Sequence, residues 1–222
     1  MFEHAILAGM RGKFITFEGG EGCGKSTQIG ILAGRLRAEG KKVLVTREPG
    51  GTRLCEKIRA LLREEFDDPP ADRAELLLFL ASRAQLVGNV IRPALERGEW
   101  VLSDRFCDST FAYQGYGRGL DLVTLKRIND FATEGLAPDL TLLLDLPPET
   151  SGRRLAARRK ATSTSADRIE LAGDGFHRRL REGFLALAKA EPERFAVIDA
   201  ARTVEETAEA VGGEVRRRLC GA

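Results

Sequence analysis

The sequence predicts an α/β fold, with a five-stranded parallel sheet covered by helices on both faces. Residues 19–26 form a complete G-x-x-x-x-G-K-[ST] phosphate loop between an apolar run and a helical segment. Five short apolar runs are too continuous for half-exposed strands. Helical patterns separate these runs, as expected when parallel strands are joined by helical crossovers. Together the three observations are typical of the P-loop NTPase fold.

The strands are expected at the apolar runs of residues 14–17, 43–46, 100–103, 140–144 and 195–198. One long helix is predicted over residues 74–97, where apolar residues recur at helical spacing and Gly98 follows as a stop. A last helix is predicted over residues 203–219, because Thr203 and Glu206 form the pattern of a capping box.

Polar side chains follow every predicted strand. The carboxyl ends of parallel strands meet at one edge of the sheet, where open α/β sheets bind their ligands. The charged side chains expected at this edge are Glu18, Arg47, Glu48, Asp104, Arg105, Asp145, Asp199 and Arg202. A sheet with a purely structural role does not need these charges, so the pattern predicts a ligand site.

Length and composition exclude several classes of protein. The 222 residues are enough for one domain, predicted over residues 10–222, and residues 1–9 are expected to be an N-terminal extension. The 35 basic residues nearly balance the 33 acidic ones, which argues against binding to nucleic acid. No apolar run approaches the length of a membrane span, so no membrane association is expected. The spacing of the four cysteines suggests neither a zinc site nor a disulfide framework. A reducing cytoplasm is therefore expected.

The phosphate loop predicts a working nucleotide site. Its glycines let successive backbone N–H groups point at phosphate oxygens, and the following helix adds partial positive charge. Lys25 is expected to reach the β- and γ-phosphates, and Ser26 to bind Mg²⁺. A glycine-rich turn that binds nothing has no need of these two residues.

Residues 147–170 are predicted to form a mobile lid, because a cluster of basic residues is followed there by small polar ones. Arginines on a lid can cover a transferring phosphoryl group and neutralise its charge. The candidates are Arg153, Arg154 and Arg158. A plain solvated loop is the alternative, since charge runs are usually exposed.

Four signatures give the sequence a resemblance to the thymidylate kinase family. They are the loop at residues 18–26, Thr-Arg-Glu-Pro-Gly-Gly-Thr at 46–52, Asp-Arg-Phe at 104–106 with Ala-Tyr-Gln-Gly at 112–115, and Asp-Arg-Ile-Glu at 167–170. A phosphate loop alone indicates only an NTPase, whereas the other signatures are specific. The resemblance spans about residues 13–199.

The resemblance implies phosphoryl transfer from MgATP to dTMP, giving dTDP and ADP for dTTP synthesis, by a homodimer. The implied ATP-binding residues are Gly19, Gly20, Glu21, Gly22, Cys23, Gly24, Lys25, Ser26, Thr27 and Arg202. The implied dTMP-binding residues are Glu21, Arg47, Glu48, Pro49, Phe79, Arg83, Arg105, Thr110, Tyr113 and Gln114. The implied catalytic residues are Lys25, Arg105, Arg153, Arg154 and Arg158.

The resemblance also gives individual roles. Arg105 matches the arginine that grips the acceptor phosphate, for which a guanidinium fork is suited. Glu21 matches an acidic residue at the 3′-hydroxyl of the deoxyribose, and Tyr113 a tyrosine packed near C2′. Phe79 matches the ring that stacks on thymine, and Arg83 a donor to a base carbonyl. On pattern alone, the last two are a core aromatic beside a solvated arginine.

Several alternatives stay open. Ser26 and Asp104 are the predicted Mg²⁺ residues, with Asp145 as the rival to Asp104. Arg47 either assists with the acceptor phosphate or pairs with neighbouring Glu48. The rival functions are phosphorylation of another nucleoside monophosphate and a P-loop switch protein that is not a metabolic enzyme.

Overall fold

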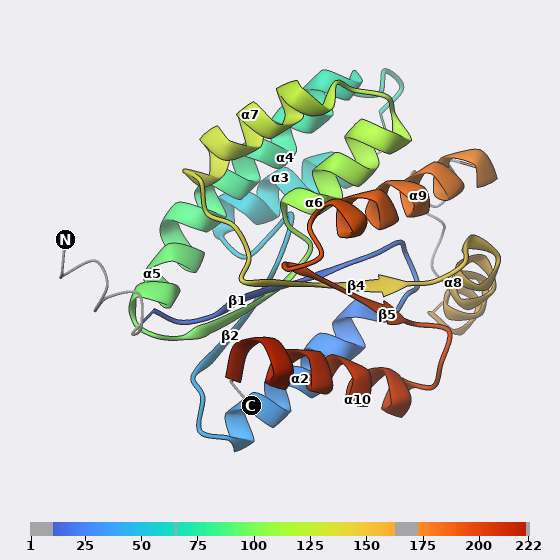
Figure 1. Ribbon diagram of the computed structural model, residues 1–222. Helices are drawn as coiled ribbons and strands as arrows, with labels where there is room; N and C mark the ends of the chain where they lie inside the picture. Colours follow the sequence, from blue (N-terminus) through green and yellow to red (C-terminus); the bar gives the residue numbers. More distant parts are fainter. Residues whose placement is uncertain (1–10, 65, 163–172, 221–222) are drawn as a thin grey trace.

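The described part of the chain folds around a sheet of five parallel strands, in the order β2-β3-β1-β4-β5 (Figure 1). The computed structural model describes residues 11–64, 66–162 and 173–220, so the extension predicted at residues 1–9 lies outside it. The strands are β1 (Phe14–Glu18), β2 (Val43–Arg47), β3 (Trp100–Asp104), β4 (Leu140–Asp145) and β5 (Phe195–Asp199). The predicted α/β fold and the predicted strands are confirmed.

Each strand extends one residue beyond its apolar run. The polar residue after the run still pairs with the neighbouring strand, as where Glu18 lies opposite Leu143 and Asp145 opposite Asp199. The charged side chains at the carboxyl edge therefore start from backbone that the sheet holds in register.

Helices cover both faces of the sheet (Figure 1). On one face α2 (Lys25–Ala38) and α10 (Val204–Val215) share a core with Ile15 and Phe17 of β1. On the other face Phe14 of β1 packs in a second core, with helical residues between 86 and 95. Because β1 is buried on both faces, its sequence is apolar without alternation. The remaining helices are α3 (Arg53–Arg63), α4 (Asp72–Leu86), α5 (Arg92–Glu96), α6 (Cys107–Thr110), α7 (Leu122–Thr133), α8 (Pro148–Thr162) and α9 (Asp174–Ala190).

The helix predicted over residues 74–97 is a composite. It begins with α4, passes through the π-helical segment η1 (Val87–Ile91) and ends in α5. In a regular α-helix Pro93 would lack a donor and its ring would collide with the carbonyl of Asn89. The wider turn of η1 accommodates this residue. A second π-helical segment, η2 (Phe111–Gly117), continues α6.

This composite helix, Asp72–Glu96, is long and apolar enough to cross a membrane by length and composition alone. Its side chains at Leu80, Leu86 and Ile91 are nevertheless buried inside the described domain. The segment is therefore a core helix.

The predicted terminal helix is observed as α10, continued by the π-helical segment η3 (Arg216–Cys220). Its capping box is confirmed. The Thr203 hydroxyl accepts the N–H of Glu206, and the Glu206 carboxylate accepts the N–H of Thr203.

A buried ion pair joins α6, which follows β3, to the start of β5. The guanidinium of Arg194 donates to the two carboxylate oxygens of Asp108 at 2.7 and 2.9 Å. Asp108 is buried, and Arg194 also donates to the hydroxyl of Thr141 at 2.7 Å. The pair fixes the backbone that leaves the carboxyl edge of the sheet.

Replacing Arg194 by Ala should lower the free energy of unfolding by about 3 kcal/mol, because the Asp108 charge would remain buried without its partner. Urea denaturation followed by circular dichroism measures the loss. Lys126→Ala is the matched control, since Lys126 and Asp130 form a solvent-exposed pair, which is expected to add little stability. Equal effects of the two substitutions would contradict a structural role for the buried pair.

Candidate nucleotide-binding cleft

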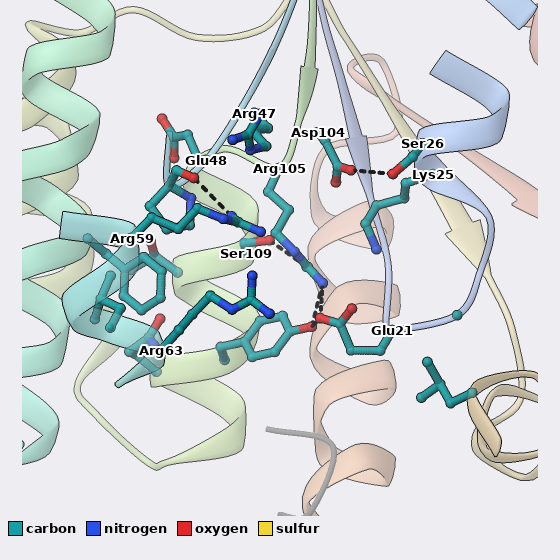
Figure 2. A pocket seen from close by; sticks show the side chains of 18 of the residues that line it. Glu21, Lys25, Ser26, Arg47, Glu48, Arg59, Arg63, Asp104, Arg105 and Ser109 are labelled. Atoms are coloured by element: carbon teal, nitrogen blue, oxygen red, sulfur yellow. Dashed lines mark hydrogen bonds and ion pairs between the residues drawn. The ribbon is translucent and has the colours of Figure 1, made fainter. Parts of the chain in front are cut away.

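A cleft of about 610 Å³ opens at the carboxyl ends of β1, β2 and β3. Its walls come from the phosphate loop, the connection from β2 to α3, helices α3, α4 and α8, and the segment after β3. Figure 2 shows side chains from these segments directed into the cleft. The predicted site residues that line it are Glu21, Gly22, Gly24, Lys25, Ser26, Thr27, Arg47, Glu48, Pro49, Phe79, Arg83, Asp104, Arg105, Thr110, Tyr113, Gln114, Arg154 and Arg158. The cleft thus lies at the edge of the sheet where the strand pattern predicts a ligand.

The phosphate loop turns tightly between β1 and α2. Gly19, Gly22 and Gly24 have φ angles of 132°, 69° and 93°, which disfavour any side chain. The Lys25 ammonium donates hydrogen bonds to the carbonyl oxygens of Gly19 at 3.1 Å and Gly20 at 2.8 Å. The loop therefore holds its lysine against its own backbone at the edge of the cleft.

Arg105 and Glu21 form an ion pair that joins the segment after β3 to the phosphate loop (Figure 2). Arg105 Nη2 lies 2.5 Å from Glu21 Oε1 and 2.8 Å from the hydroxyl of Tyr113, while Nη1 donates to the hydroxyl of Ser109 at 3.0 Å. Burial alone would raise the pKa of Glu21, but the charge of Arg105 and that of Lys25 outweigh it and lower the pKa to about 2.

The backbone of Arg105 is strained. Its φ angle of 74° lies in the left-handed region, which is uncommon for a residue other than glycine. The Arg105 N–H donates to the carbonyl of Phe17 at 3.0 Å, and its carbonyl accepts the hydroxyl of Ser103 at 2.8 Å. Strands β1 and β3 thus fix the backbone conformation that turns this guanidinium into the cleft.

Glu18 is a buried residue for which the sequence suggested no specific role. It accepts the backbone N–H of Phe106 at 2.7 Å and the hydroxyl of Ser109 at 2.6 Å. Burial raises the pKa of Glu18 to about 8, and the nearby charge of Asp108 acts in the same direction, against Arg105. Glu18 joins the end of β1 to the first turn of α6, and so holds the serine that contacts Arg105.

Arg83 is buried, so the alternative of a solvated arginine is wrong. Its side chain is 2% exposed, and Nε and Nη2 contact Glu48 at 2.8 and 2.6 Å. Nη1 donates to Thr110 at 2.8 Å and to Asn129, and Nη2 also donates to the carbonyl of Phe106 at 3.1 Å. The guanidinium thus makes four hydrogen bonds to protein acceptors, besides the ion-pair contact of Nη2 with Glu48. Donation to a base carbonyl stays a prediction.

The alternative in which Arg47 pairs with Glu48 is also wrong. Consecutive residues at the end of a strand point to opposite sides. Arg47 contacts both carboxylate oxygens of Glu56, at 2.8 and 2.9 Å, whereas Glu48 turns inward to Arg83. Burial raises the pKa of Glu48, although the charge of Arg83 acts in the opposite direction. Within the described residues Glu48 Oε1 is buried without a partner, which leaves an acceptor in the wall of the cleft.

Two arginines of α3 line the cleft although no prediction named them. Arg59 and Arg63 lie four residues apart, on one face of the helix (Figure 2). Burial lowers the pKa of Arg59, and the charges of Arg47 and Arg63 act in the same direction. Their spacing, directly after the Thr-Arg-Glu-Pro-Gly-Gly-Thr signature, is a signal that would have located them.

Only part of the predicted lid can be compared with the structure. Helix α8 covers its first half, whereas residues 163–170, with the Asp-Arg-Ile-Glu signature, lie outside the described residues. Arg154 and Arg158 line the cleft. Arg153 does not line the described cleft and donates to Thr150 at 3.1 Å.

The predicted ATP-binding residues that do not line the described cleft are Gly19, Gly20, Cys23 and Arg202. Gly19 and Gly20 still belong to the turn around Lys25, and Cys23 has its side chain in the core beside α2. Arg202 pairs with Asp199 at 3.3 Å, and its contact with ATP stays a prediction.

The hydroxyl of Ser26 and the carboxylate of Asp104 lie together, 3.1 Å apart (Figure 2). Asp145 instead accepts two hydrogen bonds of 2.7 Å from Arg181 of α9 and does not line the described cleft. Hydroxyl and carboxylate oxygens suit Mg²⁺. Among the residues described, no three His, Cys, Asp or Glu side chains gather as a metal site. An Mg²⁺ ion here would therefore need phosphate and water oxygens as further ligands.

Known proteins resemble this chain over nearly its whole length. The family profile of thymidylate kinase matches residues 17–211. A thymidylate kinase of Nitratidesulfovibrio vulgaris is 53% identical over 208 residues, covering 93% of this chain and 97% of that protein. One from Geotalea uraniireducens is 49% identical over 209 residues, covering 94% and 98%. The crystal structure of thymidylate kinase from Ehrlichia chaffeensis has a TM-score of 0.74 at 32% identity, covering 92% of this chain and 99% of that one.

The low pKa of Glu21 predicts a pH dependence of stability. A carboxyl whose pKa falls from 4.5 to about 2 on folding contributes stability that is fully present above pH 4.5 and is lost as the pH falls through 2. Glu21→Gln should therefore be less stable than the unmodified protein at pH 7, by about 1.5 to 3 kcal/mol. Urea denaturation across this pH range should find the difference shrinking below pH 4.5. A difference independent of pH would refute the assignment.

Proposed function

This chain belongs to the thymidylate kinase family, and we propose that the described cleft carries out that family's reaction. The reaction transfers the γ-phosphoryl group of ATP to the 5′-phosphate of dTMP, giving ADP and dTDP for dTTP synthesis. One observation supports the assignment to this cleft above the others. Arg105, the residue matched to the acceptor phosphate, pairs with Glu21 of the phosphate loop, and both line the same cavity.

On the donor side, the phosphate loop binds the ATP phosphates through its backbone N–H groups and the N-terminus of α2. Lys25 leaves the loop carbonyls and turns to the β- and γ-phosphates. Ser26 and Asp104, whose oxygens lie 3.1 Å apart, would hold Mg²⁺ from the protein side, Asp104 directly or through water. When bound there, Mg²⁺ would neutralise part of the phosphate charge.

On the acceptor side, Arg105 grips the phosphate of dTMP with its guanidinium fork. Glu21 is ionised at neutral pH, which makes it a strong acceptor for the 3′-hydroxyl. Phe79 stacks on thymine, and Tyr113 occupies the space that a ribose 2′-hydroxyl would need. Thr110, Arg47, Pro49 and Gln114 complete this half of the cleft.

Two further buried groups bear on the recognition of the base. The unpartnered Oε1 of Glu48 is an acceptor for a proton donor of the bound nucleotide. Arg83 holds Glu48 in place and donates to a thymine carbonyl if it releases a protein acceptor. Aromatic stacking tolerates any base, so these polar groups provide the discrimination.

Arg154 and Arg158 are the lid residues that stabilise the charge of the transferring phosphoryl group. Both line the cleft, whereas Arg153 does not line it. Phosphoryl transfer needs little covalent help, so positioned positive charge provides most of the rate enhancement.

The reaction is tested by incubating the purified protein with MgATP and each nucleoside monophosphate in turn, with ADP release as the readout. dTMP should be phosphorylated with a kcat/KM at least about 100-fold above that for the guanine, cytosine and adenine nucleotides. A preference for another monophosphate would support the rival kinase, and nucleotide hydrolysis without an acceptor would support a switch protein.

In the same assay Arg105→Ala should lower kcat/KM for dTMP by at least about 100-fold, because the acceptor phosphate loses its charged clamp. The dissociation constant of MgATP should change by less than about threefold. Arg178→Ala, on the exposed side of α9, is the control and should behave like the unmodified protein. A normal kcat/KM in Arg105→Ala would remove this residue from the site.

A homodimer in the cytoplasm is the proposed state of the protein. The neighbouring helices α4 and α7 expose the apolar side chains Leu77 (62%), Val123 (60%) and Phe131 (88%), and exposed apolar patches mark interaction surfaces. The described cysteines are unpaired, which fits a reducing compartment.

Phe131→Glu should convert the dimer to a monomer in sedimentation velocity at micromolar concentration, because a charge would be buried in the apolar contact. Leu54→Glu, on the exposed side of α3, is the control for a general loss of apolar surface. A monomeric unmodified protein, or a dimer unaffected by Phe131→Glu, would contradict the proposed interface.

A further inference from the structure

Helix α8 packs directly on the phosphate loop. Ser151, in the first turn of α8, donates its hydroxyl to the backbone carbonyl of Glu21 at 2.6 Å. One turn later Leu155 is buried, with 5% exposure, beside Gly22. A Cβ atom at Gly22 would lie 3.2 Å from Leu155 Cγ, so the helix and the loop are in contact without spare room.

The hydroxyl of Ser151 makes this contact in preference to a local one. A serine inside a helix commonly bonds the carbonyl four residues earlier in its own helix. Here Pro147 is that residue, and its carbonyl accepts the backbone N–H of Ser151 at 3.0 Å instead. The hydroxyl is directed across to the phosphate loop, and it links α8 to a segment 130 residues away.

The contact determines which lid arginines face the cleft. Ser151 and Leu155 are four residues apart and form one face of α8, which is the face that docks on the loop. Arg154 and Arg158 form the neighbouring face, and both line the cleft. A rotation of α8 about its axis by the angle between successive residues, about 100°, would carry these arginines away from the cleft.

We propose that Ser151 and Leu155 are positioning residues, which seat α8 on the phosphate loop so that Arg154 and Arg158 are held over the transferring phosphoryl group. This inference rests on the proposed kinase reaction. The tether acts through the backbone of Glu21, whose carboxylate binds Arg105. Glu21 of the phosphate loop is thereby bonded both to α8 and to Arg105.

The test compares Ser151→Ala with Ser151→Thr, which restores a hydroxyl at the same place. Ser151→Ala should lower kcat about three- to tenfold, the range expected for one lost hydrogen bond. KM for dTMP should stay within about twofold, and the midpoint of urea denaturation should not change. Ser151→Thr should recover most of kcat. Thr150→Val is the matched control, because it removes the adjacent hydroxyl, which accepts a hydrogen bond from Arg153.

A double-mutant cycle separates positioning from a general effect. In an Arg154→Ala background the added Ser151→Ala substitution should cost clearly less than it does alone, since one of the arginines it positions is absent. Equal costs in the two backgrounds, or a kcat for Ser151→Ala equal to that of the unmodified protein, would overturn the proposal.

Amide hydrogen exchange tests the docking without reference to activity. Exchange over residues 148–162 should be faster in Ser151→Ala than in the unmodified protein, with α2 and α9 unchanged. Unchanged exchange in α8 would refute the tether even in an active enzyme. Faster exchange in a protein that makes no dTDP would support the tether and refute the kinase reaction.

Discussion

The ion pair between Glu21 and Arg105 is the interaction on which the rest of the site depends. The sheet prepares it, because β1 and β3 are neighbours and Phe17 lies opposite Asp104. The phosphate loop and the acceptor arginine therefore leave the same edge side by side. The left-handed backbone of Arg105 turns its guanidinium back toward the loop, and the hydrogen bond to Phe17 holds that strain. If both residues carried charge of the same sign, they would repel each other and would not hold the phosphate loop against the segment after β3.

The charged side chains around this pair are already held by hydrogen bonds within the protein. Glu18 holds the first turn of α6, and Arg83 joins separate parts of the chain through four hydrogen bonds, to Glu48, Phe106, Thr110 and Asn129. Groups held in this way need little rearrangement when phosphates bind, which is the condition for electrostatic catalysis. The arginines of α3 and α8 that line the cleft are more exposed than Arg83.

Local patterns predicted the features that depend on neighbours in sequence. The apolar runs, the phosphate loop and the capping box are each encoded in a few consecutive residues, and each is confirmed by the structure. The partners of charged residues are not encoded in this way. Arg47 pairs with Glu56 and not with Glu48, and Asp145 pairs with Arg181. Likewise the basic cluster of α8 does not reveal which arginines face the cleft, because the docking of the helix on the phosphate loop decides it.

The central claim is that one cleft holds both nucleotides with their phosphates facing each other. It is tested most directly by titrating the protein, in a calorimeter, with adenosine and thymidine joined through five phosphates. Such a ligand spans donor and acceptor sites at once and avoids the entropy of binding two molecules. The account predicts one molecule bound per chain, more tightly than either nucleotide, with ATP and dTMP each able to displace it. Displacement by only one of them, or two molecules bound per chain, would contradict the account.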